Sequence, residues 1–221
     1  MINLDSRTDR LAQMLELTSF LHLKVDRLRA NTSQEAIDDN GNPSSHKACW
    51  TSHMRAYQEI VDNPTIHQAL ILEDDIDIEY DIHKLTPVAM DAVNRADPNW
   101  DMVYLGHCSG IERKKKVVNE AADIYPSFSP ACTHGYAVSK LGAAKLLKLL
   151  RKFKDPIDVA IIDHIQNGDL QSYSRGRPLF SQYHNKVDWS DVNANGGLGT
   201  TGDSPTTSGR DRLDAFYAGI V

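Results

Sequence analysis

Short continuous apolar runs alternate along this chain with longer segments in which apolar residues recur every three or four positions. Short apolar runs bounded by polar residues are typical of buried strands, and the longer spacing is typical of amphipathic helices. Strands are predicted at residues 69–72, 100–106, 133–138 and 177–182, and helices at residues 10–21, 45–61, 82–96 and 139–150, with a further helix beginning at Pro156. This alternation favours an α/β fold with a mainly parallel central sheet flanked by helices.

The connections between these elements are less regular. Residues 2–4 read as the end of a strand, and residues 23–25 as a second short strand. Pro87 fits best in the first turn of its predicted helix, because a missing N–H costs nothing there. Residues 107–130 show neither period, and we expect them to be irregular.

The C-terminal part of the chain differs in composition from the rest. Residues 193–209 are Gly, Thr, Ser and Asn with almost no apolar residue, so they can contribute little to a core. We therefore expect one domain at residues 2–192, followed by a mobile C-terminal segment at residues 193–221. Three residues of that segment could still dock on the domain: Leu213, Phe216 and Tyr217.

The charge and composition of the chain limit the binding partners and the cellular compartments that we expect. The net charge of −6 on 221 residues argues against a nucleic-acid binder, which usually presents a basic face. The charged first twenty residues do not form a signal peptide, and no segment approaches the length of a membrane span. We expect a chain that is soluble as given, either cytoplasmic or lumenal in the secretory pathway, and an anchor or targeting segment upstream stays open.

The three cysteines are too few and too scattered for a disulfide framework or a tetrahedral zinc site. They are Cys49, Cys108 and Cys132. Reduced thiols are therefore expected.

Three consecutive carboxylates, Glu73, Asp74 and Asp75, follow the apolar run at residues 69–72. We call them the acidic triplet. The run suits a buried central parallel strand, and in open α/β sheets ligands gather at the carboxyl ends of such strands. Because adjacent like charges repel, a divalent cation such as Mg²⁺ or Mn²⁺ would explain the arrangement, and a solvated acidic turn is the alternative. A solvated loop is the preferred interpretation of the acids that follow the triplet: Asp77, Glu79 and Asp81.

Six segments taken together, in this order, resemble glycosyltransferase family 25, which includes bacterial lipooligosaccharide galactosyltransferases and collagen-modifying galactosyltransferases. The segments are Asn3-Leu4-Asp5 with Arg7 and Arg10, Cys49 with Ser52-His53, residues 70–75, residues 100–106, residues 134–139 with Gly142-Ala143, and residues 156–158. Each is weak alone, and the six in register are specific. The chain departs from the family pattern in its clipped first strand and around Ser190-Asp191, which it follows only loosely.

The resemblance implies a GT-A fold, a nucleotide-sugar donor such as UDP-galactose, and Mn²⁺-dependent transfer with inversion to a hydroxyl of a glycan or protein. It implies that Asp75 binds the metal and that Glu73 or Asp74 contacts the ribose or a metal-bound water. His184 is a possible third metal ligand. Residues implied in donor binding are Asn3, Asp5, Arg7, Arg10 and His53, although Arg7 and Arg10 could equally be surface charge and His53 a core histidine.

Inversion requires a base that removes the proton of the acceptor hydroxyl. Asp158 is the first candidate, because it matches the Pro-x-Asp of the family at a helix start. The alternative is that Asp158 only caps that helix, and Asp163 is then the next candidate for the base. Two other functions compete with transfer: a non-catalytic module that binds a nucleotide sugar or a divalent cation, and a metal-dependent phosphohydrolase on an α/β fold.

Overall fold

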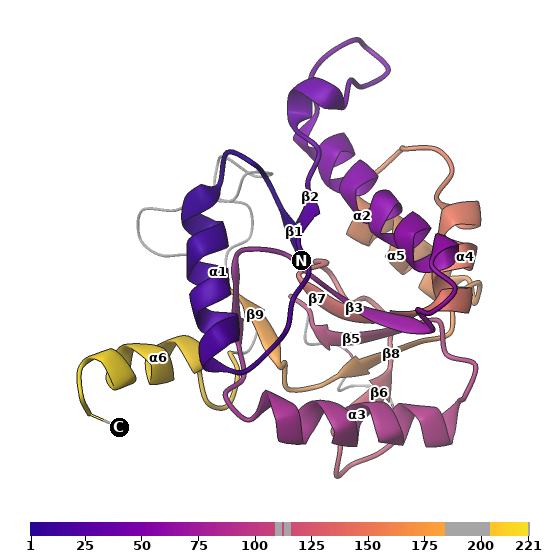
Figure 1. Cartoon of the computed structure of the whole chain (residues 1–221). Coiled ribbons are helices and arrows are strands. Elements are labelled where there is room, and N and C mark those ends of the chain that lie inside the picture. The colour runs from indigo at the N-terminus through magenta and orange to yellow at the C-terminus, as the bar shows by residue number, and fades with distance from the viewer. Residues whose placement is uncertain (109–111, 113–115, 184–203, 221) are drawn as a thin grey trace.

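The computed structural model describes residues 1–108, 112, 116–183 and 204–220 (Figure 1). Its helices are α1 Thr8–Phe20, α2 Ser45–Asp62, α3 Ile82–Ala96, α4 Lys140–Leu149, α5 Ile157–Gln166 and α6 Gly209–Tyr217, with a 3₁₀ turn η1 at Ser33–Glu35. Its strands are β1 Ile2–Asn3, β2 Leu28–Arg29, β3 Gln68–Leu72, β4 Ile76–Ile78, β5 Met102–Gly106, β6 Ile124–Pro126, β7 Gly135–Ser139, β8 Ser172–Arg175 and β9 Phe180–Gln182. Within these ranges no helix is both long enough and apolar enough to cross a bilayer.

The central sheet is mixed. Its strand order is β3-β7-β5-β8-β6, and only β5 and β8 pair in parallel. The predicted α/β class is confirmed, but the expectation of a mainly parallel sheet is wrong, because β7 and β6 run against their neighbours. Strand direction depends on where each connection returns, which an apolar run does not encode. Two small two-stranded sheets, β1-β2 and β4-β9, flank the central one.

Strand β5 lies in the middle of three layers and is buried along its whole length. Val103 and Leu105 contribute to the apolar cluster that includes α3, whereas Met102 and Tyr104 contribute to the cluster that includes α2, α4 and α5. Figure 1 shows this arrangement, with α3 on one face of the sheet and α2, α4 and α5 on the other. Full burial of such a side chain stabilises the fold by roughly 1.5–3 kcal/mol. Two-sided burial therefore explains why residues 102–105 are continuously apolar.

Strand β3 is an edge strand and not the central parallel strand that we predicted. Among the described strands it pairs with β7 alone, in antiparallel register. Ile71 and Leu72 are buried, but Leu70 is 41% exposed. Four apolar residues in a row cannot distinguish an edge from the centre of a sheet, because the neighbouring strands come from distant sequence. The acidic triplet nevertheless follows directly on the end of this strand.

The predicted helices at α1 to α5 are confirmed within a few residues. Ser139 caps α4, since its hydroxyl accepts a hydrogen bond from the amide of Gly142 at 2.9 Å. The position of Pro87 was predicted wrongly, because α3 begins at Ile82 and Pro87 is its sixth residue. The helix starts that early because the carbonyl of Asp81 already accepts from the amide of Leu85.

Three other details differ from the sequence prediction. The second short strand is β2, at Leu28–Arg29, and not residues 23–25, because β2 pairs in parallel with β1. Strand β6 lies inside the stretch expected to be irregular, and it pairs with the unpredicted strand β8. The sequence of β8, Ser-Tyr-Ser-Arg, has no apolar run, so the hydrophobic pattern does not indicate a strand there.

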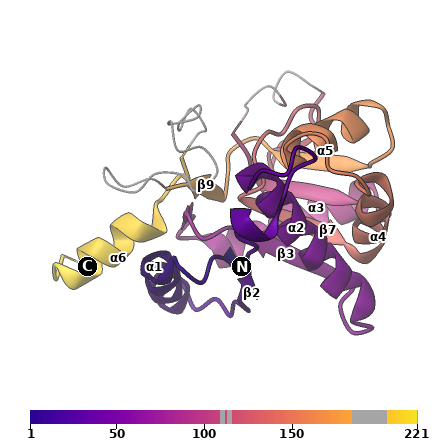
Figure 2. The same ribbon diagram turned by 90° about the horizontal axis from the view of Figure 1, so that it is seen from above.

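Helix α6 packs beside α1 (Figure 2). Leu213 is buried in the same cluster as Met14 and Leu17 of α1, and the ring of Phe216 lies 5.8 Å from that of Phe20. Tyr217 is exposed. The predicted domain boundary between residues 192 and 193 lies outside the described residues, and it stays a prediction.

Candidate active site

A cavity of about 530 Å³ lies beside the acidic triplet. Seven of the predicted site residues line it: Asn3, Arg10, His53, Glu73, Asp74, Asp75 and Asp158. They come from β1, α1, α2, the end of β3 and the start of α5, so only the fold brings them together. The volume is within the range of small-molecule pockets, roughly 300–1,000 Å³.

The N-terminal segment partly neutralises Asp74. Asn3 donates to one carboxylate oxygen of Asp74 at 2.7 Å, and Arg10 donates to the other at 3.1 Å. Burial raises the pKa of Asp74, and the contacts with Asn3 and Arg10 oppose that shift. Arg10 is itself only 3% exposed, so it is a buried partner of the triplet and not a surface charge.

Asp75 is the least satisfied member of the triplet. Its Oδ2 accepts from Arg10 at 3.3 Å, but its buried Oδ1 has no hydrogen-bond partner among the residues that the structure describes. Burial, followed by the charge of Glu73, raises the pKa of Asp75 to about 7, although Arg10 acts in the opposite direction. A buried oxygen without a donor is costly, and a cation is the partner that would satisfy it best.

Glu73 is held from two sides. Its Oε1 accepts from the hydroxyl of Thr133 at 2.7 Å and lies 3.3 Å from Nε2 of His53. Burial acts to raise the pKa of Glu73, but the hydrogen bond and charge of His53, together with Thr133, lower it overall. His53 is buried, and its Nδ1 lies 2.8 Å from the hydroxyl of Tyr136, which fixes the ring. His53 is thus a satisfied core histidine that also reaches the triplet.

The cavity offers two possible donor sets for a metal. One is the group Cys49, His53 and Glu73, whose ligand atoms lie within 4.8 Å of one another. Burial, followed by the nearby carboxylates, raises the pKa of the Cys49 thiol well above its usual value, which disfavours the thiolate that a soft metal requires. The other set is Glu73 with Asp75, whose oxygens suit the hard cations Mn²⁺ and Mg²⁺. The orphaned Oδ1 of Asp75 favours the second set.

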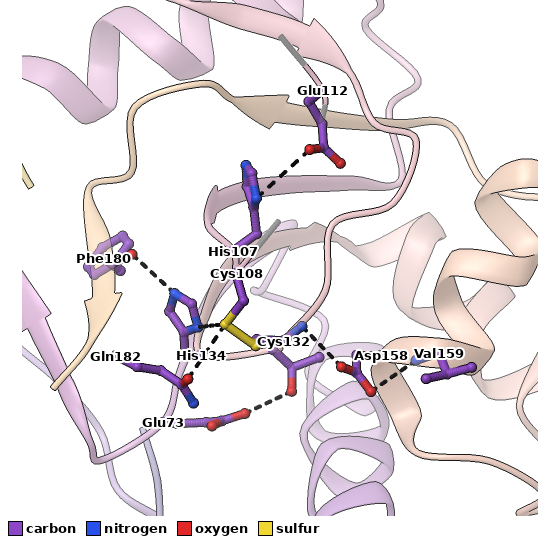
Figure 3. Close-up of a disulfide and its surroundings, with 11 residues drawn as sticks. Glu73, His107, Cys108, Glu112, Cys132, His134, Asp158, Val159, Phe180 and Gln182 are labelled. Carbon is purple, nitrogen blue, oxygen red and sulfur yellow. Dashed lines mark hydrogen bonds and ion pairs between the residues drawn. A yellow bond between two sulfur atoms is a disulfide. The ribbon is translucent and has the colours of Figure 1, made fainter. Parts of the chain in front are cut away.

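Asp158 lies in the first turn of α5 and on the same cavity. Its Oδ2 accepts from the backbone amide of Cys132 at 3.0 Å, and its Oδ1 accepts from the amide of Val159 at 2.9 Å (Figure 3). Pro156 occupies the N-cap position, so Asp158 is the second residue of the helix and not its cap. A carboxylate at this end is favoured by the helix dipole.

Cys108 and Cys132 form a disulfide, so the expectation of reduced thiols is wrong for these two residues. Cys108 follows β5 and Cys132 precedes β7, and the pairing of these two antiparallel strands brings the Cα atoms to 5.7 Å. They are 24 residues apart, and nothing in the local sequence indicates that proximity. Cys49 is a free thiol. Thr133, beside the disulfide, is also a site residue that the sequence did not indicate.

Asp77 and Glu79 are buried, which contradicts the solvated loop that we predicted for them. Asp77 accepts from the amide of Arg210 at 3.1 Å, and Glu79 accepts from the amide of Thr207 at 3.0 Å. Both carboxylates are therefore satisfied by the segment that leads into α6. Asp81 is partly exposed, with a side chain 41% accessible, and it pairs with Lys84 at 2.6 Å.

Some predicted site residues lie away from the cavity. Asp5 pairs with Arg27 and Arg29, and Arg7 pairs with Asp9 at 2.9 Å. Asp163 is on the exposed side of α5. Within the described part of the chain, Asp5, Arg7 and Asp163 are not among the residues that line the cavity. His184 and Ser190-Asp191 lie outside the described residues.

Comparison with known families bears on this geometry. Residues 1–161 match the model of glycosyltransferase family 25, described as an LPS biosynthesis protein family. This chain belongs to glycosyltransferase family 25. The matched region includes every described residue of the triplet, its N-terminal partners and Asp158.

The curated relatives of this family 25 chain include larger proteins. Human procollagen galactosyltransferase 2 is 28% identical over 167 residues, which cover 66% of this chain and 26% of that protein. Zebrafish procollagen galactosyltransferase 1 is 28% identical over 208 residues, which cover 79% of this chain and 34% of that protein. A glycosyltransferase 25 family member from Anopheles gambiae is 28% identical over 168 residues, which cover 67% of this chain and 28% of that protein. The chain thus spans about a quarter to a third of the relatives that it matches.

Proposed function

We propose that this family 25 chain is a metal-dependent, inverting glycosyltransferase. It moves a hexose, galactose in the first instance, from a UDP-sugar to a hydroxyl of a glycan or protein acceptor. Galactose is suggested by the names of the human and zebrafish relatives, both of which are procollagen galactosyltransferases. The single observation that carries the proposal is that one cavity contains both the incompletely satisfied Asp75 and the carboxylate of Asp158.

Asp75 and Glu73 are the residues that would hold Mn²⁺ or Mg²⁺. When bound, such a cation stabilises as a Lewis acid the negative charge that develops on the departing diphosphate. Arg10 fixes Asp74 and Asp75 through contacts at 3.1 and 3.3 Å and adds positive charge beside the cavity. His53 and Thr133 fix Glu73, so the carboxylates are held before any ligand arrives.

Asp158 is the proposed base. Each of its carboxylate oxygens accepts one backbone hydrogen bond, which leaves a further lone pair on each for the hydroxyl of an acceptor. The two amides hold the carboxylate in one orientation, so it can take the hydroxyl proton as the acceptor oxygen attacks the anomeric carbon. Attack opposite the diphosphate inverts that carbon.

The alternative is a non-catalytic module that binds a nucleotide sugar or a cation. Asp158→Asn separates the two functions, because Asn preserves the shape and the acceptor oxygen for Cys132 but is no base. Transfer of sugar from a panel of UDP-hexoses in Mn²⁺ should fall by about 10²–10⁴-fold in this variant, while the affinity for UDP stays the same. Wild-type protein that binds UDP but transfers no sugar from any donor to hydroxyl acceptors would support the binding module.

A matched control for this experiment is Asp163→Asn, which removes an exposed carboxylate one turn and a half further along the same helix. Its transfer rate should equal that of the wild type. A variant at Asp163 that loses transfer while Asp158→Asn retains it would move the base to Asp163.

A further inference from the structure

The Cys108–Cys132 disulfide lies next to the proposed base, Asp158, and close to Glu73 of the acidic triplet (Figure 3). It joins the end of β5 to the residues just before β7. Those residues contact both halves of the cavity: the amide of Cys132 donates to Asp158 at 3.0 Å, and the hydroxyl of Thr133 donates to Glu73 at 2.7 Å. The carbonyl of His134 also accepts from the amide of Glu73 at 3.1 Å.

The backbone of Cys132 is in the left-handed region, with φ of 68°. A residue with a side chain is uncommon there and requires surrounding structure to hold it. This conformation accompanies the hydrogen bond from the Cys132 amide to Asp158. The bond from its Sγ to Cys108 is a covalent restraint on that residue, and the amide of Cys108 adds a hydrogen bond of 2.9 Å to the carbonyl of Ala131.

Within the described residues, α5 itself gives the Asp158 carboxylate only a local contact. Its other hydrogen bond, from Val159, comes from the adjacent residue and moves with it. Of the two hydrogen bonds that the Asp158 carboxylate accepts within the described residues, the one from Cys132 therefore ties the side chain to the segment that also contacts the triplet. Displacement of a reacting group by about 1 Å can cost on the order of 100-fold in rate.

We propose that the Cys108–Cys132 disulfide is a positioning element for transfer, which holds the Cys132 amide on Asp158 and so sets the distance between the base and the donor. This inference rests on the proposed function. A dithiol reductant would convert the bridge to two thiols while its own two thiols become a cyclic disulfide, so electrons and protons balance. The chain would then reach its full rate only in an oxidising compartment.

The first experiment compares the oxidised chain with the same chain after treatment with dithiothreitol, with free thiols counted by mass spectrometry after alkylation. We expect the transfer rate per folded molecule to fall by about 10- to 100-fold on reduction. The affinity for UDP in Mn²⁺ should change by less than the rate. The double variant Cys108→Ser/Cys132→Ser is the control, because its rate should be low already and should not respond to dithiothreitol.

A second measurement separates positioning from a general loss of structure. The reduction is repeated on Asp158→Asn, where the bridge has no base left to position. Groups that act as one unit are strongly non-additive, so reduction should cost this variant less than about twofold in its residual transfer. Melting curves on the same samples give the folded fraction at the assay temperature. Rates are divided by this fraction, so the test stays valid if the serine variant folds poorly.

Two results would overturn the inference while leaving the proposed function intact. One is an unchanged transfer rate after complete reduction of the bridge. The other is an equal fold loss on reduction in wild type and in Asp158→Asn, which would mean that the bridge acts on the whole fold and not through the base. Failure of the oxidised wild type to transfer any sugar is a different result, and it would remove the proposed function itself.

Discussion

Three adjacent carboxylates have three different environments in this chain. Glu73 is held by His53 and Thr133, and its pKa is lowered although burial opposes this; Asp74 is held by Asn3 and Arg10, and burial raises its pKa. Asp75 retains a buried oxygen to which no described residue donates. Partners from β1, α1, α2 and the residues before β7 thus support each carboxylate of the acidic triplet to a different extent, and Asp75 the least.

Asp75→Asn keeps the shape of the side chain but removes the charge. We expect the rate of sugar transfer to fall by at least about 100-fold with the fold intact. Even changing a residue that only hydrogen-bonds to a metal ligand typically lowers metal affinity or activity by about 10- to 100-fold. The matched control is Asp81→Asn, a carboxylate outside the cavity that pairs with Lys84. The measurement is initial rate at saturating Mn²⁺ together with a melting curve. Equal rates in the two variants would place the metal elsewhere.

The binding of Mn²⁺ should depend on pH through Asp75. Burial raises the pKa of Asp75 to about 7, above its unfolded value of 3.8, so the proton favours the folded state. The stability that this group contributes is complete below the unfolded value and is lost as pH rises through about 7. Metal requires the carboxylate, so the Kd for Mn²⁺ should decrease by up to about tenfold per unit as pH rises toward 7. Calorimetric titration of the protein with Mn²⁺ at several pH values measures this dependence. A Kd that is constant from about pH 6 to about pH 8 would contradict the prediction, as would the same dependence of Kd on pH in Asp75→Asn.

At the scale of elements, α6 is fastened to β4, the strand that follows the acidic triplet. The guanidinium of Arg210 donates to the carbonyl of Ile76 at 3.0 and 2.7 Å, and the backbone amide of Arg210 donates to Asp77. The carbonyl of Asp75 accepts from the amide of Tyr183 at 2.7 Å, just after β9, and the ring of Tyr183 lies under the Arg210 guanidinium. Segments far beyond the triplet therefore hold the backbone on its C-terminal side.

Gly209→Ala tests whether α6 requires this close approach. A Cβ at Gly209 would lie 2.6 Å from the carbonyl oxygen of Ile78, so backbone must shift. Such overpacking typically costs about 1–3 kcal/mol, and we expect a lower melting temperature. Asp214→Ala, on the exposed side of the same helix, is the control and should change little. A Gly209→Ala protein as stable as wild type would mean that α6 does not need this contact.

At the scale of the molecule, the cavity lies where β1, the start of α2, the end of β3 and the start of α5 meet. Ligand that bridges these elements should stabilise the folded state as a whole, since a ligand that binds only the folded state raises stability by mass action.

UDP with Mn²⁺ should therefore raise the melting temperature, by an amount equivalent to about 2.7 kcal/mol at a concentration of about 100 Kd. The increase should be much smaller when EDTA replaces Mn²⁺, because the diphosphate then faces the triplet without a cation between them. Thermal unfolding in the two buffers measures this, with uridine as the control that lacks the diphosphate. Equal shifts with and without metal would argue against a metal-bridged diphosphate.

The sequence by itself determined the elements whose signals are local. Helical spacing and caps located α2 and α4, and the continuous run at residues 102–105 predicted the buried strand β5, because two-sided burial requires such a run. The family motifs indicated seven candidate residues that line the cavity, including Arg10, the triplet and Asp158.

Only the tertiary structure decided properties that depend on neighbours from distant sequence. These are the direction and edge position of β3, the burial of Asp77 and Glu79, the Cys108–Cys132 bridge and the orphaned oxygen of Asp75. The spacing of apolar residues indicates which face of a helix or strand is buried, but not which element covers that face. Pairing of β7 with both β3 and β5 brings the triplet close to the bridge, and the packing of α5 against the same sheet places Asp158 beside them. No local pattern encodes that pairing or that packing.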